Sequence, residues 1–216
     1  MLMIFKAETG SRWYGTETPE SDQDIIEVMV EDPREMILEG QFETIQDKCG
    51  IVDTTNYGLA KFCKLLKRGS PNLTQILWHE HPLYSDPRWE ILVASRDALV
   101  SQKTAKKLYK MGVSAAGKWR QERNLKSAAV AYQRFIECSM LVGTGGFAYP
   151  LNQEVAGEIV AIKEKVLRDS EIDELILHVE VNAFRQVVSN LLKPEIDSHA
   201  IDKACVDIYS QIWGIT

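Results

Sequence analysis

Residues 10–24 read Gly-Ser-Arg-Trp-Tyr-Gly-Thr-Glu-Thr-Pro-Glu-Ser-Asp-Gln-Asp, and this stretch decides how the chain is interpreted. The apolar residues 1–7 precede it and are predicted to form a strand. Residues 24–30 (Asp-Ile-Ile-Glu-Val-Met-Val) are β-branched and partly alternating, which predicts a second strand with one buried face. Between the strands, glycine, threonine and proline indicate turns.

The first residues of this stretch have the chemistry of a phosphate site. Gly10 follows a strand, and a residue without a side chain lets backbone N–H groups approach a phosphate closely. Ser11 adds a hydroxyl donor, and Arg12 adds a planar cationic fork that suits phosphate. We therefore predict that these three residues contact a phosphorylated ligand.

The last residues of the stretch have the chemistry of a divalent metal site. Asp22 and Asp24 are two positions apart at the start of a strand, so both side chains project to one face of the sheet. A divalent cation relieves the repulsion between such carboxylates, and hard oxygen ligands suit Mg²⁺ that also takes oxygens from a phosphate. Asp53, at the end of a short apparent strand over residues 50–53, is a candidate third ligand.

The remainder of the chain is predicted to be helical. Helical periodicity and stop signals predict helices over residues 59–68, 72–78 (capped by Asn72), 126–142, 170–192 (opened by a Ser170-x-x-Asp173 capping box) and 198–213, and Ser101 is the predicted N-cap of a further, basic helix before residue 126. Beyond Arg96 no strand pattern is present in the sequence. These patterns predict an α+β protein with a mixed α and β domain at residues 1–95 and an all-helical domain at residues 96–216.

Composition excludes disordered and membrane-spanning classes. The chain has 216 residues, of which 45% are hydrophobic, and a formal net charge of −6. The longest apolar run at the N-terminus covers five residues, too few for a signal peptide or a membrane span. Four cysteines without a C-x-x-C pair suit a reducing compartment. We expect a soluble, cytoplasmic protein without membrane partners.

Charge is distributed unevenly along the sequence. Residues 1–53 contain 13 acidic and 4 basic residues, whereas residues 96–126 contain 9 basic and 2 acidic residues. An acidic cluster can hold divalent cations and a basic stretch can hold phosphates. Two solvated faces of opposite sign explain the same counts, so charge alone leaves both interpretations open.

With its neighbours, the opening stretch resembles the RNA-repair-associated (RlaP-type) predicted nucleotidyltransferases of the DNA polymerase β superfamily. Members of that superfamily have a Gly-Ser step, then an Asp-x-Asp pair, then a third Asp on a neighbouring strand. Residues 10–24 match the RlaP-type form of this motif almost position by position, and residues 53–72 keep the spacing of a second block. Shorter and weaker matches in residues 126–128, 144–151 and 192–197 extend the resemblance over nearly the whole chain.

The resemblance implies a polymerase-β-like catalytic domain and a nucleotide bound between it and the helical domain. The implied reaction moves a nucleoside monophosphate from a nucleoside triphosphate to an acceptor hydroxyl, with Mg²⁺ or Mn²⁺ as cofactor. Asp22, Asp24 and Asp53 would be the catalytic and metal-binding residues, and the spacing of the family favours Asp53 over Asp47 as the third carboxylate. Gly10, Ser11, Arg12 and Lys126 would bind the nucleotide.

The acceptor is left open by the sequence. The resemblance points to an RNA 3′ end, such as a broken tRNA, but Val130 and Gln133 replace the His and Arg that are frequent in the helical motif of the family. A protein or small-molecule hydroxyl is an alternative acceptor, and a non-catalytic RNA- or partner-binding protein is an alternative function. His79-Glu80-His81 lacks the spacing of a zinc site and is interpreted as a loop.

Overall fold

The computed structural model describes residues 1–39, 44–189 and 191–214. The chain forms two compact units: Met1–Trp13, Glu20–Leu99 and Asp197–Thr216 make the first, and Tyr14–Pro19 and Val100–Ile196 make the second. Both units are therefore discontinuous in sequence, unlike the division at residue 95 that the sequence suggested. The C-terminal helix belongs to the first unit, and the middle of the opening stretch belongs to the second.

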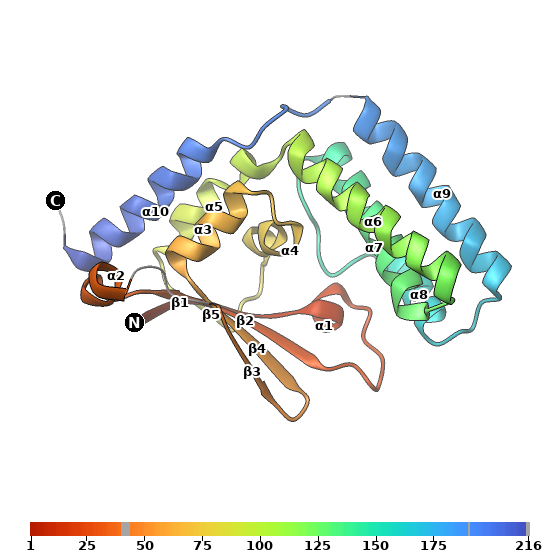
Figure 1. The fold of residues 1–216 in the computed structure, drawn as a ribbon, viewed down its shortest axis with the longest axis horizontal. Helices are drawn as coiled ribbons and strands as arrows, with labels where there is room; N and C mark the ends of the chain where they lie inside the picture. Colours follow the sequence, from red (N-terminus) through yellow and green to blue (C-terminus); the bar gives the residue numbers. More distant parts are fainter. Residues whose placement is uncertain (40–43, 190, 215–216) are drawn as a thin grey trace. The chain divides into compact units, whose positions relative to one another are not determined.

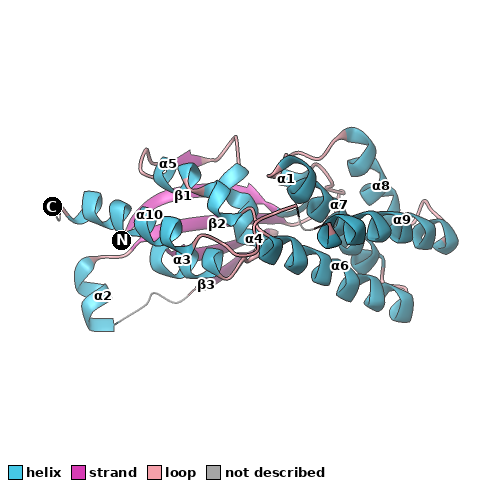
Figure 2. Cartoon of the chain, turned by 90° about the horizontal axis from the view of Figure 1, so that it is seen from above, coloured by secondary structure: helices cyan, strands magenta, loops and turns pink. Residues whose placement is uncertain are grey.

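A five-stranded mixed sheet forms the centre of the first unit. The strands are β1 (Leu2–Thr9), β2 (Gln23–Val30), β3 (Ile45–Cys49), β4 (Val52–Gly58) and β5 (Tyr84–Ser85), and their order in the sheet is β3-β4-β2-β1-β5. Strands β2 and β4 are parallel, and the other neighbouring pairs are antiparallel. Figure 2 shows this sheet in magenta. It confirms the prediction of an α+β fold with a mixed sheet.

Helices cover one face of this sheet. The helices of the first unit are α1 (Gly10–Tyr14), α2 (Pro33–Glu39), α3 (Leu59–Lys67), α4 (Pro71–Thr74), α5 (Trp89–Ala94) and α10 (Ser198–Trp213), with 3₁₀ turns at Gln75–Trp78 and Arg96–Leu99. Figure 1 shows α3, α5 and α10 on the same side of the strands. Apolar residues at helical spacing in α3, such as Leu59, Phe62 and Leu66, are fully buried. Helix α10 packs on α3 and α5 through Ile201, Ala204 and Ile208.

The second unit is built from helices alone within its described residues. They are α6 (Gln102–Glu122), α7 (Leu125–Thr144), α8 (Gln153–Lys163) and α9 (Asp169–Val188), and α7 packs against the other three. Ser101 caps α6 by accepting a hydrogen bond from the Thr104 amide, and Gly145 ends α7 in the left-handed conformation, as predicted. Helix α8 is not among the predicted helices. No described helix is long and apolar enough to cross a membrane.

Two predicted helix starts are wrong. Helix α4 begins after Ser70 rather than at Asn72, because Pro71 occupies the first helical position, where its missing N–H costs nothing. Helix α9 begins after Arg168, whose backbone N–H donates to the Glu171 carboxylate at 2.8 Å. The predicted capping pair of Ser170 and Asp173 is therefore not the one used. Asp173 instead accepts hydrogen bonds from Trp119 and Arg123 on α6.

Two predicted element ends also differ. Asp53 lies near the start of β4 rather than at the end of a short strand, because the chain turns at Gly50 (φ +62°) and then stays extended to Gly58. The helix predicted to reach Leu192 ends at Val188.

Candidate active site

The register of three strands brings the predicted carboxylates to one face of the sheet. Asp24 on β2 is paired with Asp53 on the parallel strand β4, and paired residues of neighbouring strands project to the same side. Asp22 precedes the first residue of β2, and its carboxylate lies 3.6 Å from Lys48, the register partner of Asp53 on the strand β3. Thr9, at the end of β1, is the antiparallel partner of Asp24. Strand pairing thus brings together Asp24 and Asp53, which are 29 positions apart in the sequence.

Gly10 lies directly against Asp24. A Cβ atom added at position 10 would be 2.0 Å from Oδ2 of Asp24, far inside van der Waals contact. Gly10 also has a φ of +67°, the left-handed conformation that favours glycine. Both features require glycine at this position, and they let the backbone of the Gly-Ser step touch a carboxylate of the Asp-x-Asp pair.

Two side chains of β3 bind the other two carboxylates. Gln46 donates from Nε2 to both carboxylate oxygens of Asp53, at 3.1 and 3.0 Å. Lys48 lies 3.6 Å from the carboxylate of Asp22, in an ion pair whose two side chains are more than half exposed. Neither residue is predicted from the sequence, because residues 45–49 lack the alternation of apolar and polar side chains that indicates a strand. The Gln-x-Lys alternation on a strand beside Asp53 is the signal that identifies them.

Asp47 lies on the opposite face of the sheet from Asp53. Its register partner on β4 is Thr54, the residue next to Asp53, and neighbouring positions of a strand project to opposite sides. Strand geometry therefore separates Asp47 from the group formed by Asp22, Asp24 and Asp53.

Helix α1 carries the predicted phosphate-binding residues Ser11 and Arg12. The Arg12 side chain is exposed and pairs with Glu8, with 3.9 Å between Nε and the carboxylate. The next residue, Trp13, stacks on His79, with ring centroids 4.7 Å apart and planes inclined by 17°. The ring of His79 therefore packs against α1.

His79 is held in a half-buried site. Its Nε2 lies 3.0 Å from the carbonyl oxygen of Glu8, which makes Nε2 the donating nitrogen. Burial lowers the pKa of His79 below its ordinary value. Its Nδ1 is buried without a hydrogen-bond partner. His79 therefore packs and hydrogen-bonds within the first unit, whereas His81 of the same tripeptide is exposed.

Lys126 belongs to the second unit. It is exposed in the first turn of α7, and its charge contributes to lowering the pKa of Lys163, after the larger effect of burial. Lys163 donates from Nζ to the carbonyl oxygen of Thr16, in the middle of the opening stretch. Within the second unit, Lys126 is thus electrostatically coupled to the lysine that holds residues 14–19. Its predicted contact with a nucleotide stays a prediction.

The donor set of the first unit fits a divalent cation in its chemistry. Asp22, Asp24 and Asp53 provide hard carboxylate oxygens on one sheet face, which Mg²⁺ and Mn²⁺ prefer. Among the described residues, no three His, Cys, Asp or Glu side chains are already gathered in a metal-binding arrangement. Gln46 and Lys48 hold two of the three carboxylates, so binding of a cation would require these contacts to be exchanged.

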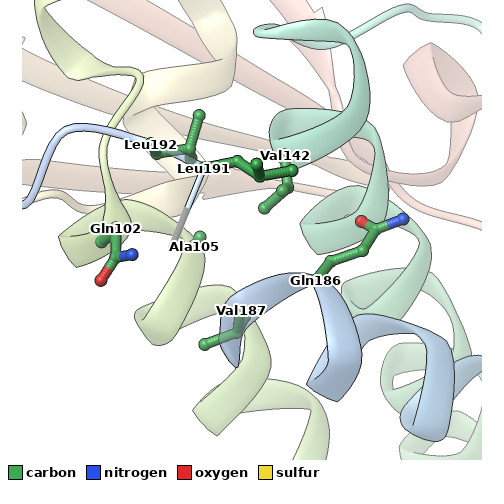
Figure 3. Close-up of a pocket in the computed structure, with 7 residues that line it drawn as sticks. All are labelled: Gln102, Ala105, Val142, Gln186, Val187, Leu191 and Leu192. Carbon is green, nitrogen blue, oxygen red and sulfur yellow. The ribbon is translucent and has the colours of Figure 1, made fainter. Parts of the chain in front are cut away.

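The cavity drawn in Figure 3 belongs to the second unit. It is lined in the second unit by Gln102, Ala105, Val142, Gln186, Val187, Leu191 and Leu192. It has no room for a water molecule, and the buried Oε1 of Gln186 has no hydrogen-bond partner. It is therefore a packing gap rather than a ligand site.

Comparison with known proteins gives one family. Residues 1–191 match the family described as "RlaP: RNA repair pathway DNA polymerase beta family". A search of curated proteins finds no match. Among solved structures, the chain is similar to a nucleotidyltransferase-like protein from Exiguobacterium sibiricum 255-15, with 10% sequence identity, a TM-score of 0.35, and coverage of 97% of this chain and 74% of that chain. A TM-score of 0.35 is too low to support conclusions about function.

Proposed function

The chain belongs to the RlaP family, the RNA repair pathway DNA polymerase beta family, and from this premise we propose that it is a metal-dependent nucleotidyltransferase whose acceptor is the 3′ end of an RNA. Membership supports nucleotidyl transfer in general. The acceptor, the metal and the residue roles are parts of the proposal. The observation that carries it is the pairing of Asp24 with Asp53 on one sheet face, with Gly10 against Asp24.

The proposed reaction exchanges one phosphorus–oxygen bond for another. The acceptor hydroxyl oxygen bonds to the α-phosphorus of a nucleoside triphosphate, the bond from that phosphorus to the bridging oxygen breaks, and pyrophosphate leaves. The hydroxyl proton is released to solvent. Bound Mg²⁺ would lower the pKa of the acceptor hydroxyl and offset the charge of the leaving oxygens. Asp22 and Asp24 would hold both ions, and Asp53 would complete the site nearest the attacking oxygen.

The Gly-Ser step would hold the β- and γ-phosphates. The close approach of Gly10 to Asp24 puts the backbone that would contact the phosphates next to a carboxylate that would hold the metal. Ser11 and Arg12 follow on α1 and would donate hydrogen bonds to phosphate oxygens. The ion pair of Arg12 with Glu8 is long and exposed, so exchanging it for a phosphate contact would cost little.

An RNA acceptor is favoured over the alternatives by the description of the family. The basic stretch of the sequence is only partly available for RNA, because Lys103, Arg120 and Arg123 of α6 and its C-cap pair with Glu195, Glu180 and Asp173. The proposal of an RNA acceptor therefore rests on the description of the family and not on the charge of the basic stretch.

Transfer of label tests the proposal. The protein is incubated with each α-labelled nucleoside triphosphate, with Mg²⁺ or Mn²⁺, and with total RNA or a protein extract. The test variant is Asp24→Asn. The matched control is Asp47→Asn, which makes the same chemical change on the opposite face of the sheet.

Label that enters RNA with wild-type protein and Asp47→Asn, but not with Asp24→Asn, would support the proposal. Label that enters only protein would show that the acceptor is a protein and not RNA. Transfer that persists in Asp24→Asn would contradict the assigned site. RNA binding that survives chelation, without transfer under any condition, would favour a non-catalytic binding protein.

A further inference from the structure

Helix α9 exposes a row of large apolar side chains. Leu177, Val181, Phe184 and Val188 are 55, 38, 52 and 58% exposed, although α9 already buries another face in the second unit through Ile172, Ile176, Val179 and Ala183. The spacings of four, three and four residues place the exposed side chains in one stripe along the helix. This is the pattern of a helix that packs against a second helix.

The neighbouring helix α6 extends the stripe. Tyr109 of α6 contacts Phe184, with ring centroids 6.0 Å apart, and Arg120 of α6 donates to Glu180. Trp119, near the end of α6, donates a hydrogen bond to Asp173, near the start of α9. The two helices are therefore antiparallel neighbours, as Figure 1 shows. Val113, between these contacts on α6, is 37% exposed. We call Val113, Leu177, Val181, Phe184 and Val188 the α6–α9 face.

The size of the face is that of the apolar part of a dimer interface. At these exposures its side chains present on the order of 400 Å² of apolar surface, the size of the largest apolar patch on a typical monomer, which is often functional. A stable interface buries about 800 Å² on each partner, of which somewhat more than half is apolar. The face therefore supplies the apolar share of a standard interface.

We propose that the α6–α9 face is the contact surface of a homodimer, in which α9 packs antiparallel on α9 of a second copy about a two-fold axis near Val181 and Phe184. The spacing of the stripe is self-complementary under this axis, since Leu177 of one copy then lies opposite Val188 of the other. A two-fold arrangement also closes the assembly at two copies.

Sedimentation equilibrium of the full chain over a wide range of concentrations tests the dimer. We expect wild-type protein to dimerise, and Val181→Asp to raise the dimer dissociation constant by at least roughly tenfold. Val206→Asp is the matched control, because Val206 is 61% exposed on α10 and lies outside the face. Circular dichroism and thermal unfolding establish that each variant is folded.

A second comparison tests the proposed axis. Leu177→Lys and Val188→Glu should each weaken the dimer, and the double variant should restore association, because Leu177 of one copy lies opposite Val188 of the other. A wild-type chain that is monomeric at every concentration would overturn the proposal. A dimer that tolerates Val181→Asp but not Val206→Asp would place the interface elsewhere, and a double variant that associates no better than the two single variants would overturn the antiparallel arrangement.

Discussion

The carboxylate of Asp24 fills the space beside Gly10 that a side chain would need: its Oδ2 lies 2.0 Å from the point where a Cβ of residue 10 would be. The two residues are at opposite ends of the opening stretch, and pairing of β1 with β2 returns the chain to this contact. A phosphate-binding backbone and a metal-binding carboxylate are predicted to meet at this point. The contact makes the site sensitive to a single methyl group.

Gly10→Ala should therefore slow transfer by about 100-fold or more while the protein remains folded. The left-handed backbone costs an L-residue about 1 kcal/mol, and the added methyl group must displace the Asp24 carboxylate. Displacement by about 1 Å is enough to slow a reaction by about 100-fold. Gly50→Ala is the matched control, because Gly50 has a φ of +62° but open space around its Cβ. Equal loss of activity in the two variants would show that backbone strain, and not contact with Asp24, is responsible.

Gln46→Ala should strengthen binding of Mn²⁺. The amide of Gln46 occupies both oxygens of Asp53, and a hydrogen bond of about 0.5–1 kcal/mol that must be exchanged for the metal corresponds to a roughly two- to fivefold change in affinity. Calorimetric titration with Mn²⁺ measures the change. Weaker binding would mean that Gln46 orients Asp53 toward the metal instead of competing with it.

The stability of the first unit should fall as the solution becomes acidic, in part through His79. Burial lowers the pKa of folded His79 below its ordinary value of 6.5, so the unfolded chain takes up the proton first. Its contribution is complete above about pH 6.5 and is lost as the pH falls through the folded pKa. Urea unfolding at about pH 7.5 and about pH 5.5 should show a smaller difference for His79→Phe than for wild type. His199→Phe, at an exposed position on α10 of the same unit, should keep the wild-type difference.

Glu137→Ala should destabilise the second unit by about 3–5 kcal/mol. Glu137 is fully buried and accepts hydrogen bonds from Gln133, Arg134 and Tyr149. Its removal leaves the buried guanidinium of Arg134 without its counter-charge. Thermal unfolding measures the loss, and Arg134→Met combined with Glu137→Leu should recover most of it. A loss below about 1 kcal/mol in Glu137→Ala would contradict the assigned ion pair.

Gln186→Met should stabilise the second unit by about 1 kcal/mol, because it removes a buried carbonyl oxygen that has no partner. The side chain lies beside the apolar lining shown in Figure 3, which a thioether can contact. The melting temperature should rise by about 2–4 °C. Gln121→Met, at an exposed position on α6, should leave it unchanged. A lower melting temperature for Gln186→Met would show that its amide has a structural role.

The local patterns predicted most elements because each depends on neighbouring residues. Alternating apolar residues bury one face of β2, and the helical spacing in α3 buries Leu59, Phe62 and Leu66. The predicted start of α4 is wrong because Pro71 and Asn72 both favour a helix start. The predicted start of α9 is wrong because the Glu171 carboxylate accepts a hydrogen bond from the backbone of Arg168. Asp173 is instead bound by Trp119 of α6.

The Gly-Ser step, the Asp-x-Asp pair and most of the strands and helices follow from the amino-acid sequence alone, since these are properties of adjacent residues. Only the tertiary structure decided that Gln46 and Lys48 hold two of the carboxylates, that Asp47 faces away, and that α10 belongs to the first unit. Strand register and helix packing join residues that are distant in sequence, and a shift of register by one residue would move Asp53 to the opposite face. The free energy that selects one register comes from burial of the whole sheet face, which no local segment contains.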